Sequence, residues 1–337
     1  MRSAVKTIIQ YLFIFGLTAL LIWFSLRNLH VKEGENKWQY LYHTWQAADK
    51  GWLILMAGIF MLGQAIRAER WRMLMEPTGY QATFYHSFLA MLIGYLVNLV
   101  IPRGGEVSRC YYLYKLNKSP VEISFGTVVI ERIVDLLCLV LLVALSFAVE
   151  SEKLFAFIST LPIQANGLTG KLMIVGIAIL ILIAGGFFIS WYSKRNQKLG
   201  AFIQRTWLGF KQGLAAIFKL ERKYLFILYS AAIWALYFMM SFCVVMAFKE
   251  TSVLGITAVL SLFAIGAIAM AAPLPGGAGS YHTLVPAGLV FLYAIPQSDA
   301  VAFTFVFHAW QTLIMIVSGA IALIVTSWIV KKKSALS

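Results

Sequence analysis

The chain has 337 residues, of which 61% are hydrophobic and only 12% are charged. Soluble domains usually carry about twice that share of charged residues, so the composition excludes a soluble protein and predicts an all-α polytopic membrane protein. The formal net charge is +14. Because the cations occupy short loops beside apolar segments, they favour anionic lipid surfaces as partners and argue against nucleic acid.

No polar stretch is long enough to form a separate core, so we expect a single integral membrane domain over residues 1–337. The three cysteines, Cys110, Cys138 and Cys243, lie far apart. Their spacing predicts neither a disulfide framework nor a metal site. No pattern in the chain indicates a cofactor.

The apolar segments predict membrane spans in chain order. Residues 7–26 are long enough to span and lack a small-residue cleavage site, which favours a first transmembrane helix over a signal peptide. Residues 52–66 form a second, shorter span, and the cations that follow it are predicted to lie in a cytoplasmic loop: Arg67, Arg70 and Arg72. The other uninterrupted spans are predicted at 123–149, 172–192, 224–248 and 301–330. In the basic segment 194–223, apolar residues at helical spacing predict an amphipathic helix on the membrane surface.

Two further apolar segments are interrupted by proline and glycine, which disfavour a continuous helix. Residues 84–116 break at Pro102, and residues 254–295 break at Pro275. Cytoplasmic loops carry the excess of lysine and arginine, which places both termini in the cytoplasm. With this orientation each broken segment enters and leaves on the same side. The simplest fold therefore has six full spans and two oppositely oriented re-entrant hairpins.

The halves at about 1–150 and 171–333 then share one order: span, span, broken hairpin, span. Their opposite orientation predicts an inverted repeat, as in many transporters whose broken helices meet near the middle of the membrane. The alternative is eight transmembrane helices joined by ordinary Pro-Gly loops. Cations around the first break, such as Arg103 and Lys118, disfavour that alternative because it would place them outside.

Ionisable residues within apolar sequence predict the functional site, because such groups are costly in a membrane unless they are paired or hydrated. Arginines would hold an anionic head group, since the guanidinium fork matches phosphate oxygens, and carboxylates would orient the arginines or bind a cationic part of the ligand. The alternative for the pair at 132 and 135 is a purely structural ion pair. The candidate residues are Arg103, Arg109, Arg132, Glu106, Glu131 and Asp135.

Backbone amides at Gly104-Gly105 and Gly276-Gly277 are expected to add donors for an anion. His308 and Gln311 share one face of the last span. For these two, a satisfied hydrogen bond between helices is the simpler interpretation, and a role in transport is the alternative.

Three motifs appear in order: Asn98-x-x-x-Pro102-x-Gly104-Gly105-Glu106-x-x-Arg109, then Glu131-Arg132-x-x-Asp135, then Pro275-Gly276-Gly277-x-Gly279. Together they resemble the lysylphosphatidylglycerol synthetase transmembrane-region family, also called flippase-like domain proteins. The resemblance implies a bacterial or archaeal inner-membrane protein that moves lipid between leaflets, and it adds Asn98 to the candidate site. The chain departs from the family in two ways. It has no synthase domain, so we do not expect it to attach lysine to lipid itself, and Ser280-Tyr281-His282 stand where the family often has a glutamate.

The leading hypothesis is a flippase that translocates an anionic phospholipid or a lipid-linked head group. No nucleotide-binding loop is present, so a gradient or the lipid's own distribution would drive it. One alternative is a membrane-embedded lipid or glycosyl transferase with Glu106, Glu131 or Asp135 as its base, although no catalytic motif supports an enzyme. The other is a scaffold for a lipid or glycan synthase. Such a synthase and a second copy of the chain remain open as protein partners.

Overall fold

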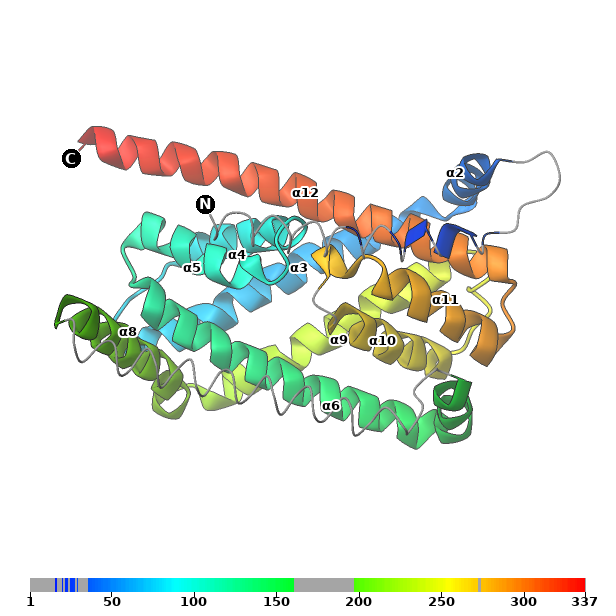
Figure 1. Ribbon diagram of the computed structural model, residues 1–337, viewed down its shortest axis with the longest axis horizontal. Helices are drawn as coiled ribbons and strands as arrows, with labels where there is room; N and C mark the ends of the chain where they lie inside the picture. The colour runs from blue at the N-terminus through cyan, green and yellow to red at the C-terminus, as the bar shows by residue number, and fades with distance from the viewer. Residues whose placement is uncertain are drawn as a thin grey trace.

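The computed structural model describes residues 36–160, 197–271 and 274–336, with a few positions between residues 16 and 29. All regular structure in these residues is helical, and most helices run along the long axis of the molecule (Figure 1). The predicted span 172–192 lies outside the described residues, and the predicted span 7–26 lies largely outside them. The total of six full spans therefore stays a prediction.

Three described helices are long and apolar enough to cross a membrane: α3 (Lys50–Met75), α9 (Lys223–Ala247) and α12 (Gln297–Leu336). Helices α3 and α9 pack side by side and run in opposite directions. The start of α3 meets the end of α9, where the Asp49 amide donates to the Ala247 carbonyl at 2.8 Å. The 40-residue helix α6 (Val121–Thr160) contains the predicted span 123–149 and has one non-helical residue, Glu150. The chain is thus a polytopic helical membrane protein, as its composition predicts.

Helix α3 runs beyond the predicted span 52–66, and the prediction of three loop cations after Ile66 was wrong. Arg67 and Arg70 are one helical turn apart and lie on the buried face, with 5% and 0% of their surface exposed. Arg72 points to another side of the helix. There it pairs with Glu69 of α3 and with Glu76 of η1 (Glu76–Thr78), at 2.6 Å each. Helical spacing therefore separates two interior arginines from one peripheral arginine.

The first broken segment forms a hairpin of α4 (Phe84–Asn98) and α5 (Gly104–Asn117). Its two ends are close together, since the Asn117 side chain donates to the Gln81 carbonyl at 3.3 Å. At the bend, Asn98 Oδ1 accepts the Gly105 amide at 2.7 Å. A β-carbon on Gly105 would lie only 2.2 Å from the Gly94 carbonyl oxygen, so glycine is what lets the two helices approach.

The second broken segment forms a hairpin of α10 (Ile256–Ala271), η4 (Pro275–Gly277) and α11 (Ser280–Tyr293). Glu150 ties its two ends together, accepting from Ser261 at 2.8 Å and from Tyr293 at 2.6 Å. At the bend, Gly276 and Gly277 adopt positive φ angles of 58° and 72°, a conformation that favours glycine.

The two bends lie next to each other near the middle of the molecule (Figure 1). A β-carbon on Gly276 would lie 3.1 Å from Leu99 Cδ2 at the first bend. Helix α12 passes both hairpins, and its His308 bonds to the Gly276 carbonyl at 3.1 Å. Each hairpin therefore begins and ends at one end of the molecule and turns in the centre. The order α3, hairpin, α6 recurs as α9, hairpin, α12.

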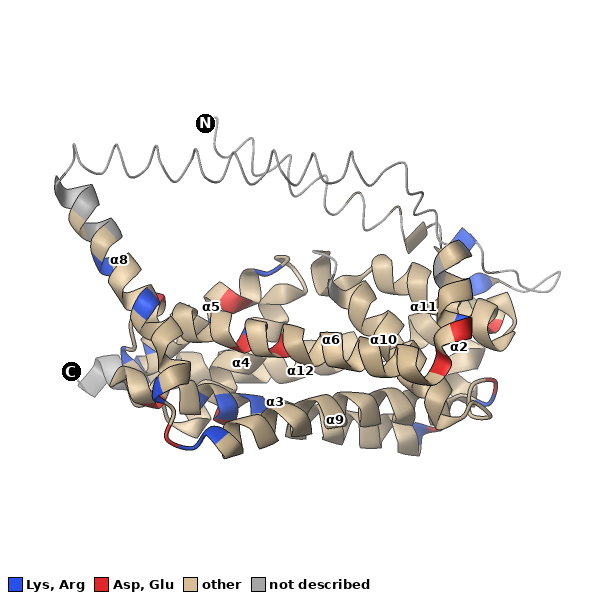
Figure 2. Cartoon of the chain, turned by 90° about the horizontal axis from the view of Figure 1, so that it is seen from below, with Lys and Arg blue, Asp and Glu red and all other residues tan. Residues whose placement is uncertain are grey.

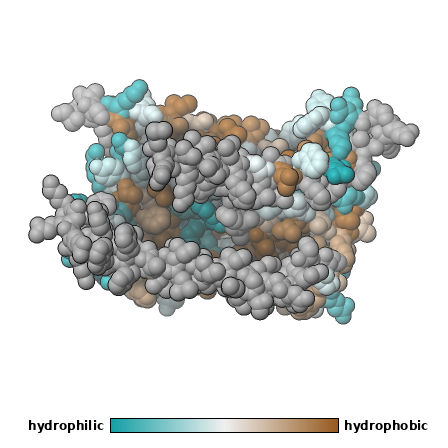
Figure 3. Space-filling model, viewed as in Figure 1, coloured by the Kyte–Doolittle hydropathy of each residue, from teal (hydrophilic) through white to brown (hydrophobic). Residues whose placement is uncertain are grey.

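The predicted amphipathic segment forms α8 (Gln197–Ala215) and η3 (Ala216–Lys219), and α2 (Lys37–Ala47) lies at the opposite end of the molecule (Figure 1). Part of α8 packs directly on α6. The approach is close at Gly213, where a β-carbon would lie only 2.3 Å from the Ile123 carbonyl oxygen. Charged residues lie mainly at the two ends of the molecule, with a further group on the helices between them (Figure 2). In the space-filling view, hydrophilic surface lies at both ends and in a central recess between hydrophobic regions (Figure 3).

We expect Gly105→Ala to destabilise the first hairpin, because its methyl group would collide with the α4 backbone. Gly58→Ala on α3 is the matched control, since a β-carbon there would meet nothing within 4 Å. Overpacking typically costs about 1–3 kcal/mol. Thermal unfolding of the purified protein in detergent should show a lower midpoint for Gly105→Ala and an unchanged or higher one for Gly58→Ala. Equal midpoints would contradict the tight hairpin.

Candidate functional site

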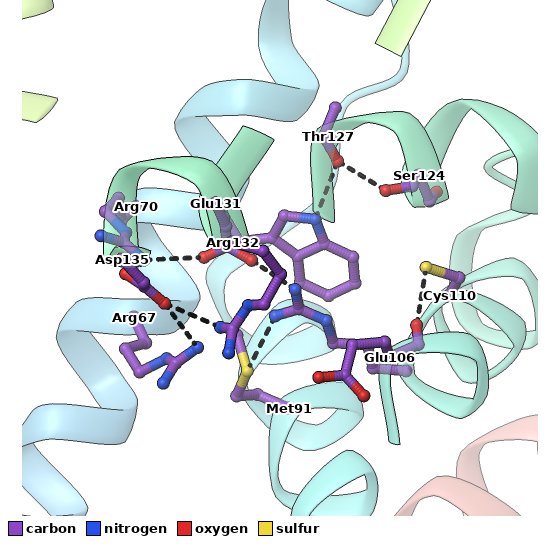
Figure 4. Close-up of polar contacts among 12 residues, drawn as sticks. Arg67, Arg70, Met91, Glu106, Cys110, Ser124, Thr127, Glu131, Arg132 and Asp135 are labelled. Atoms are coloured by element: carbon purple, nitrogen blue, oxygen red, sulfur yellow. Dashed lines mark hydrogen bonds and ion pairs between the residues drawn. The ribbon is translucent and has the colours of Figure 1, made fainter. Parts of the chain in front are cut away.

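Four arginines and two carboxylates meet in the interior between α3, α5 and α6 (Figure 4). Helix α3 supplies two of the arginines, α5 supplies one, and α6 supplies the fourth together with both acids. We call this group the arginine cluster. Its members are Arg67, Arg70, Arg109, Arg132, Glu131 and Asp135.

Glu131 is fully buried and lies between two arginines from different helices. Its carboxylate is 2.5 Å from Arg109 Nη2 and 3.4 Å from Arg70 Nη2. The Arg109 guanidinium also lies over the Trp71 ring, 4.8 Å from the ring centroid, and Trp71 donates to Thr127 at 3.0 Å. A buried carboxylate is stable only when it is paired in this way. Glu131 therefore joins α3, α5 and α6.

Asp135 lies one helical turn further along α6 and contacts three arginines. The distances are 2.7 Å to Arg70, 2.9 Å to Arg132 and 3.5 Å to Arg67. Arg67 in turn donates to the hydroxyls of Tyr95 and Tyr237 at 2.7 and 2.6 Å. The structural ion pair anticipated for Arg132 and Asp135 is thus present, as one part of a larger network.

The arginine cluster contains two more cations than anions, and the carboxylate of Glu106, at the same small cavity as Arg109 and Arg132, reduces the local surplus to one. Among the described residues, the buried Nε atoms of its four arginines have no hydrogen-bond partner. One oxygen of Glu106, on the neighbouring α5, is also buried without a partner. Uncompensated charge is costly in an apolar interior and marks a functional site by default.

A cavity of about 540 Å³ adjoins the arginine cluster. Its wall includes Arg103, Arg132, Asp135 and Gln311, which are all predicted site residues. A smaller cavity of about 50 Å³ lies against Asn98, Gly105, Glu106, Arg109 and Arg132. The larger volume is within the range of about 300–1,000 Å³ that small-molecule sites occupy. Arg132 lines both cavities, and its side chain is 36% exposed.

Three of the four glycine amides predicted as donors to an anion are bonded within the protein. The Gly104 amide donates to the Ile101 carbonyl at 2.9 Å, and the Gly277 amide donates to the Leu274 carbonyl at 3.0 Å. The Gly105 amide is held by Asn98. These three amides therefore shape the bends, and a role of the glycine amides as donors to an anion stays a prediction. Gly276 contributes its carbonyl, which bonds His308.

His308 makes the hydrogen bond between segments that was the simpler interpretation of its position. Its ring lies 4.7 Å from that of His282 and 5.7 Å from that of Tyr281. Gln311, one turn along α12, lines the larger cavity instead. The second hairpin thus contributes packing around the cavity, whereas the charges come from the first half of the chain.

Sequence reasoning missed four residues of the site: Arg67, Arg70, Tyr95 and Tyr237. The two arginines looked like a loop because they follow a short apolar run and precede Arg72. Their spacing of three residues was the available signal for a shared buried face. The two tyrosines carried no signal, since aromatic residues are common throughout the spans.

These features define a polytopic helical membrane protein with a buried arginine–carboxylate cluster beside a central cavity. Residues 7–319 match the family described as the lysylphosphatidylglycerol synthase TM region, and the chain belongs to this family. A similar curated protein is the UPF0104 membrane protein MJ1595 of Methanocaldococcus jannaschii, 38% identical over 87 residues. That match covers 25% of this chain and 26% of the relative, so the chain spans about a quarter of the relative's length. No solved structure matches the chain.

We expect Glu131→Gln to destabilise the protein, because Arg70 and Arg109 would lose a fully buried countercharge. Removing one partner of a buried ion pair typically costs about 3–5 kcal/mol. Glu122→Gln on the same helix is the control, since Glu122 is partly exposed and lies 4.0 Å from Arg205. Thermal unfolding of the purified protein in detergent should show a lower midpoint temperature for Glu131→Gln and an unchanged one for Glu122→Gln. A Glu131→Gln protein as stable as the control would show that the cluster does not hold the helices together.

Proposed function

We propose that the protein is a lipid flippase that translocates an anionic phospholipid or lipid-linked head group across the membrane. The observation that carries this proposal is the cation surplus of the arginine cluster beside the 540 Å³ cavity. A phosphate entering this cavity would meet the Arg132 guanidinium and reduce the uncompensated charge. Guanidinium groups suit this role because they match phosphate oxygens with two parallel hydrogen bonds.

The surroundings of the cavity support a lipid rather than a soluble anion. An apolar groove of about 950 Å³ runs between α6, α9 and α10, and Trp234 lines both the groove and the cavity. Helix α6 also borders both spaces. Its Val134 and Cys138 line the groove, and the next residue in each case, Asp135 and Leu139, lines the cavity. A head group in the cavity would therefore have apolar surface next to it for acyl chains.

The arrangement of the two hairpins supports alternating access. Each hairpin begins and ends at one end of the molecule, and the bends meet at Leu99 and Gly276 in the centre. In a bilayer, this arrangement corresponds to two re-entrant hairpins of opposite orientation around a site at mid-depth. The two halves, α3 to α6 and α9 to α12, would rock about this site and expose the cavity to each leaflet in turn.

The charge distribution gives the proposed orientation. The end of the molecule that holds α8 and the C-terminal part of α12 gathers lysines and arginines (Figure 2). Lys118 caps the end of α5, Arg222 caps the start of α9, and Lys331 lies in the last part of α12. By the positive-inside rule this end faces the cytoplasm of a bacterial or archaeal cell, in the inner membrane. The first hairpin would then enter from the cytoplasm and the second from outside.

We expect Arg132→Gln to reduce translocation of anionic lipid about tenfold or more, because Arg132 is the cluster arginine most exposed to the cavity. The assay uses proteoliposomes with fluorescent phosphatidylglycerol, whose outer-leaflet fraction is bleached by dithionite. Arg205→Gln is the control, because Arg205 is 83% exposed on α8.

Wild-type protein should accelerate exchange over protein-free vesicles, and the control should match it. Absence of acceleration for any of several anionic lipids would contradict the proposed function. An Arg132→Gln protein that translocates lipid as fast as the wild type would contradict the proposed site but not the proposed flippase activity.

A further inference from the structure

Part of the lining of the 540 Å³ cavity is polar but uncharged, and we call this part the neutral wall. It contains two amide side chains, Gln64 of α3 and Gln311 of α12, together with the indole of Trp234 on α9. The rings of Tyr95 and Tyr281 also line the cavity. Neither Gln64 nor Trp234 was a predicted site residue, and the proposed anion site makes no use of them.

Two buried polar atoms on this neutral wall lack partners among the described residues: Gln64 Oε1 and Trp234 Nε1. Gln64 is 1% exposed. A buried polar atom without a hydrogen bond is costly, so each such atom in a native protein calls for a ligand or a water. The two atoms have opposite polarity, because the amide oxygen accepts and the indole N–H donates.

A hydroxyl group both donates and accepts, so it satisfies either atom. We propose that the neutral wall is a subsite for the hydroxyl-rich part of a head group, a polyol or sugar attached to the phosphate. In this arrangement the phosphate lies toward Arg132 and the hydroxyls lie toward Gln64 and Trp234, with the rings of Tyr95 and Tyr281 beside the C–H faces of the polyol. This inference rests on the proposed function and specifies its substrate class.

Head groups of equal charge isolate the contribution of the hydroxyls. Phosphatidylethanol, phosphatidylglycerol and phosphatidylinositol each carry one phosphodiester charge but differ in hydroxyl number. With matched acyl chains, native mass spectrometry of the full chain in detergent should show affinity rising in that order. We expect phosphatidylinositol to bind about tenfold more tightly than phosphatidylethanol, the factor expected from one or two net hydrogen bonds.

Gln64→Leu and Trp234→Phe each remove one of the two polar atoms, and Gln64→Leu keeps a similar shape. Each should bring the affinity ratio toward one. Gln64 does not line the apolar groove, so Gln64→Leu should also leave phosphatidylethanol binding unchanged, which shows that this variant folds. Gln46→Leu is the control, because Gln46 is exposed on α2. Arg132→Gln should weaken all three lipids alike.

Equal binding of the three lipids to the wild-type protein would overturn the inference and indicate that water alone occupies the neutral wall. A ratio that survives both substitutions would overturn it as well. In both cases an effect of Arg132→Gln would leave the proposed function intact. Failure of all three lipids to bind would instead remove the proposed function, and this inference with it.

Discussion

The structure depends on the pairing of Glu131 and Asp135 with four arginines inside an apolar molecule. Without the two carboxylates, four like charges would lie within a few ångströms in a medium of low dielectric, where their repulsion is strong. With the carboxylates, the arginines bind α3, α5 and α6 into one unit. The compensation is incomplete, and this distinguishes the cluster from a purely structural ion pair.

Two features of the fold bring the charges and the cavity together. The small residues at the bends let each hairpin turn within the molecule, through Gly105 in the first and through Gly276 and Gly277 in the second. The two bends therefore meet in the centre of the molecule, and neither hairpin extends along its full length. This leaves room for a cavity, which the side chains of a bundle of continuous helices would fill. Arg132 and Asp135 of the arginine cluster line that cavity, and so do the neutral polar side chains of Gln64, Gln311 and Trp234.

Much of this arrangement was predictable from the sequence. The breaks at Pro102 and Pro275 indicated broken helices, because proline disrupts a continuous helix. The charged residues of α6 indicated a buried site, because ionisable residues within a membrane are costly unless they are paired or hydrated. The family assignment made from the motifs is confirmed. The ion pair between Arg132 and Asp135, which was one interpretation of their spacing, is also present, whereas the pair between Arg109 and Glu131 was not anticipated.

The remainder depended on contacts that a linear pattern does not record. Arg70 is buried because Ser230, Glu131 and Asp135 surround it from other helices, and hydropathy alone places such a residue at a membrane surface. The glycine amides looked available to an anion, yet three of the four already donate to Asn98 or to a neighbouring carbonyl. Gln64 gave no signal, since one amide in an apolar helix becomes notable only when its surroundings leave it unpaired.

The most direct measurement is an experimental density map of the protein in lipid nanodiscs that contain phosphatidylglycerol. We expect both bends near the middle of the bilayer, the four arginines buried between them and the neighbouring helices, and phosphate density within hydrogen-bond distance of Arg132. An arginine cluster at the level of the lipid head groups, or a cavity that contains water but no lipid, would contradict the central claim.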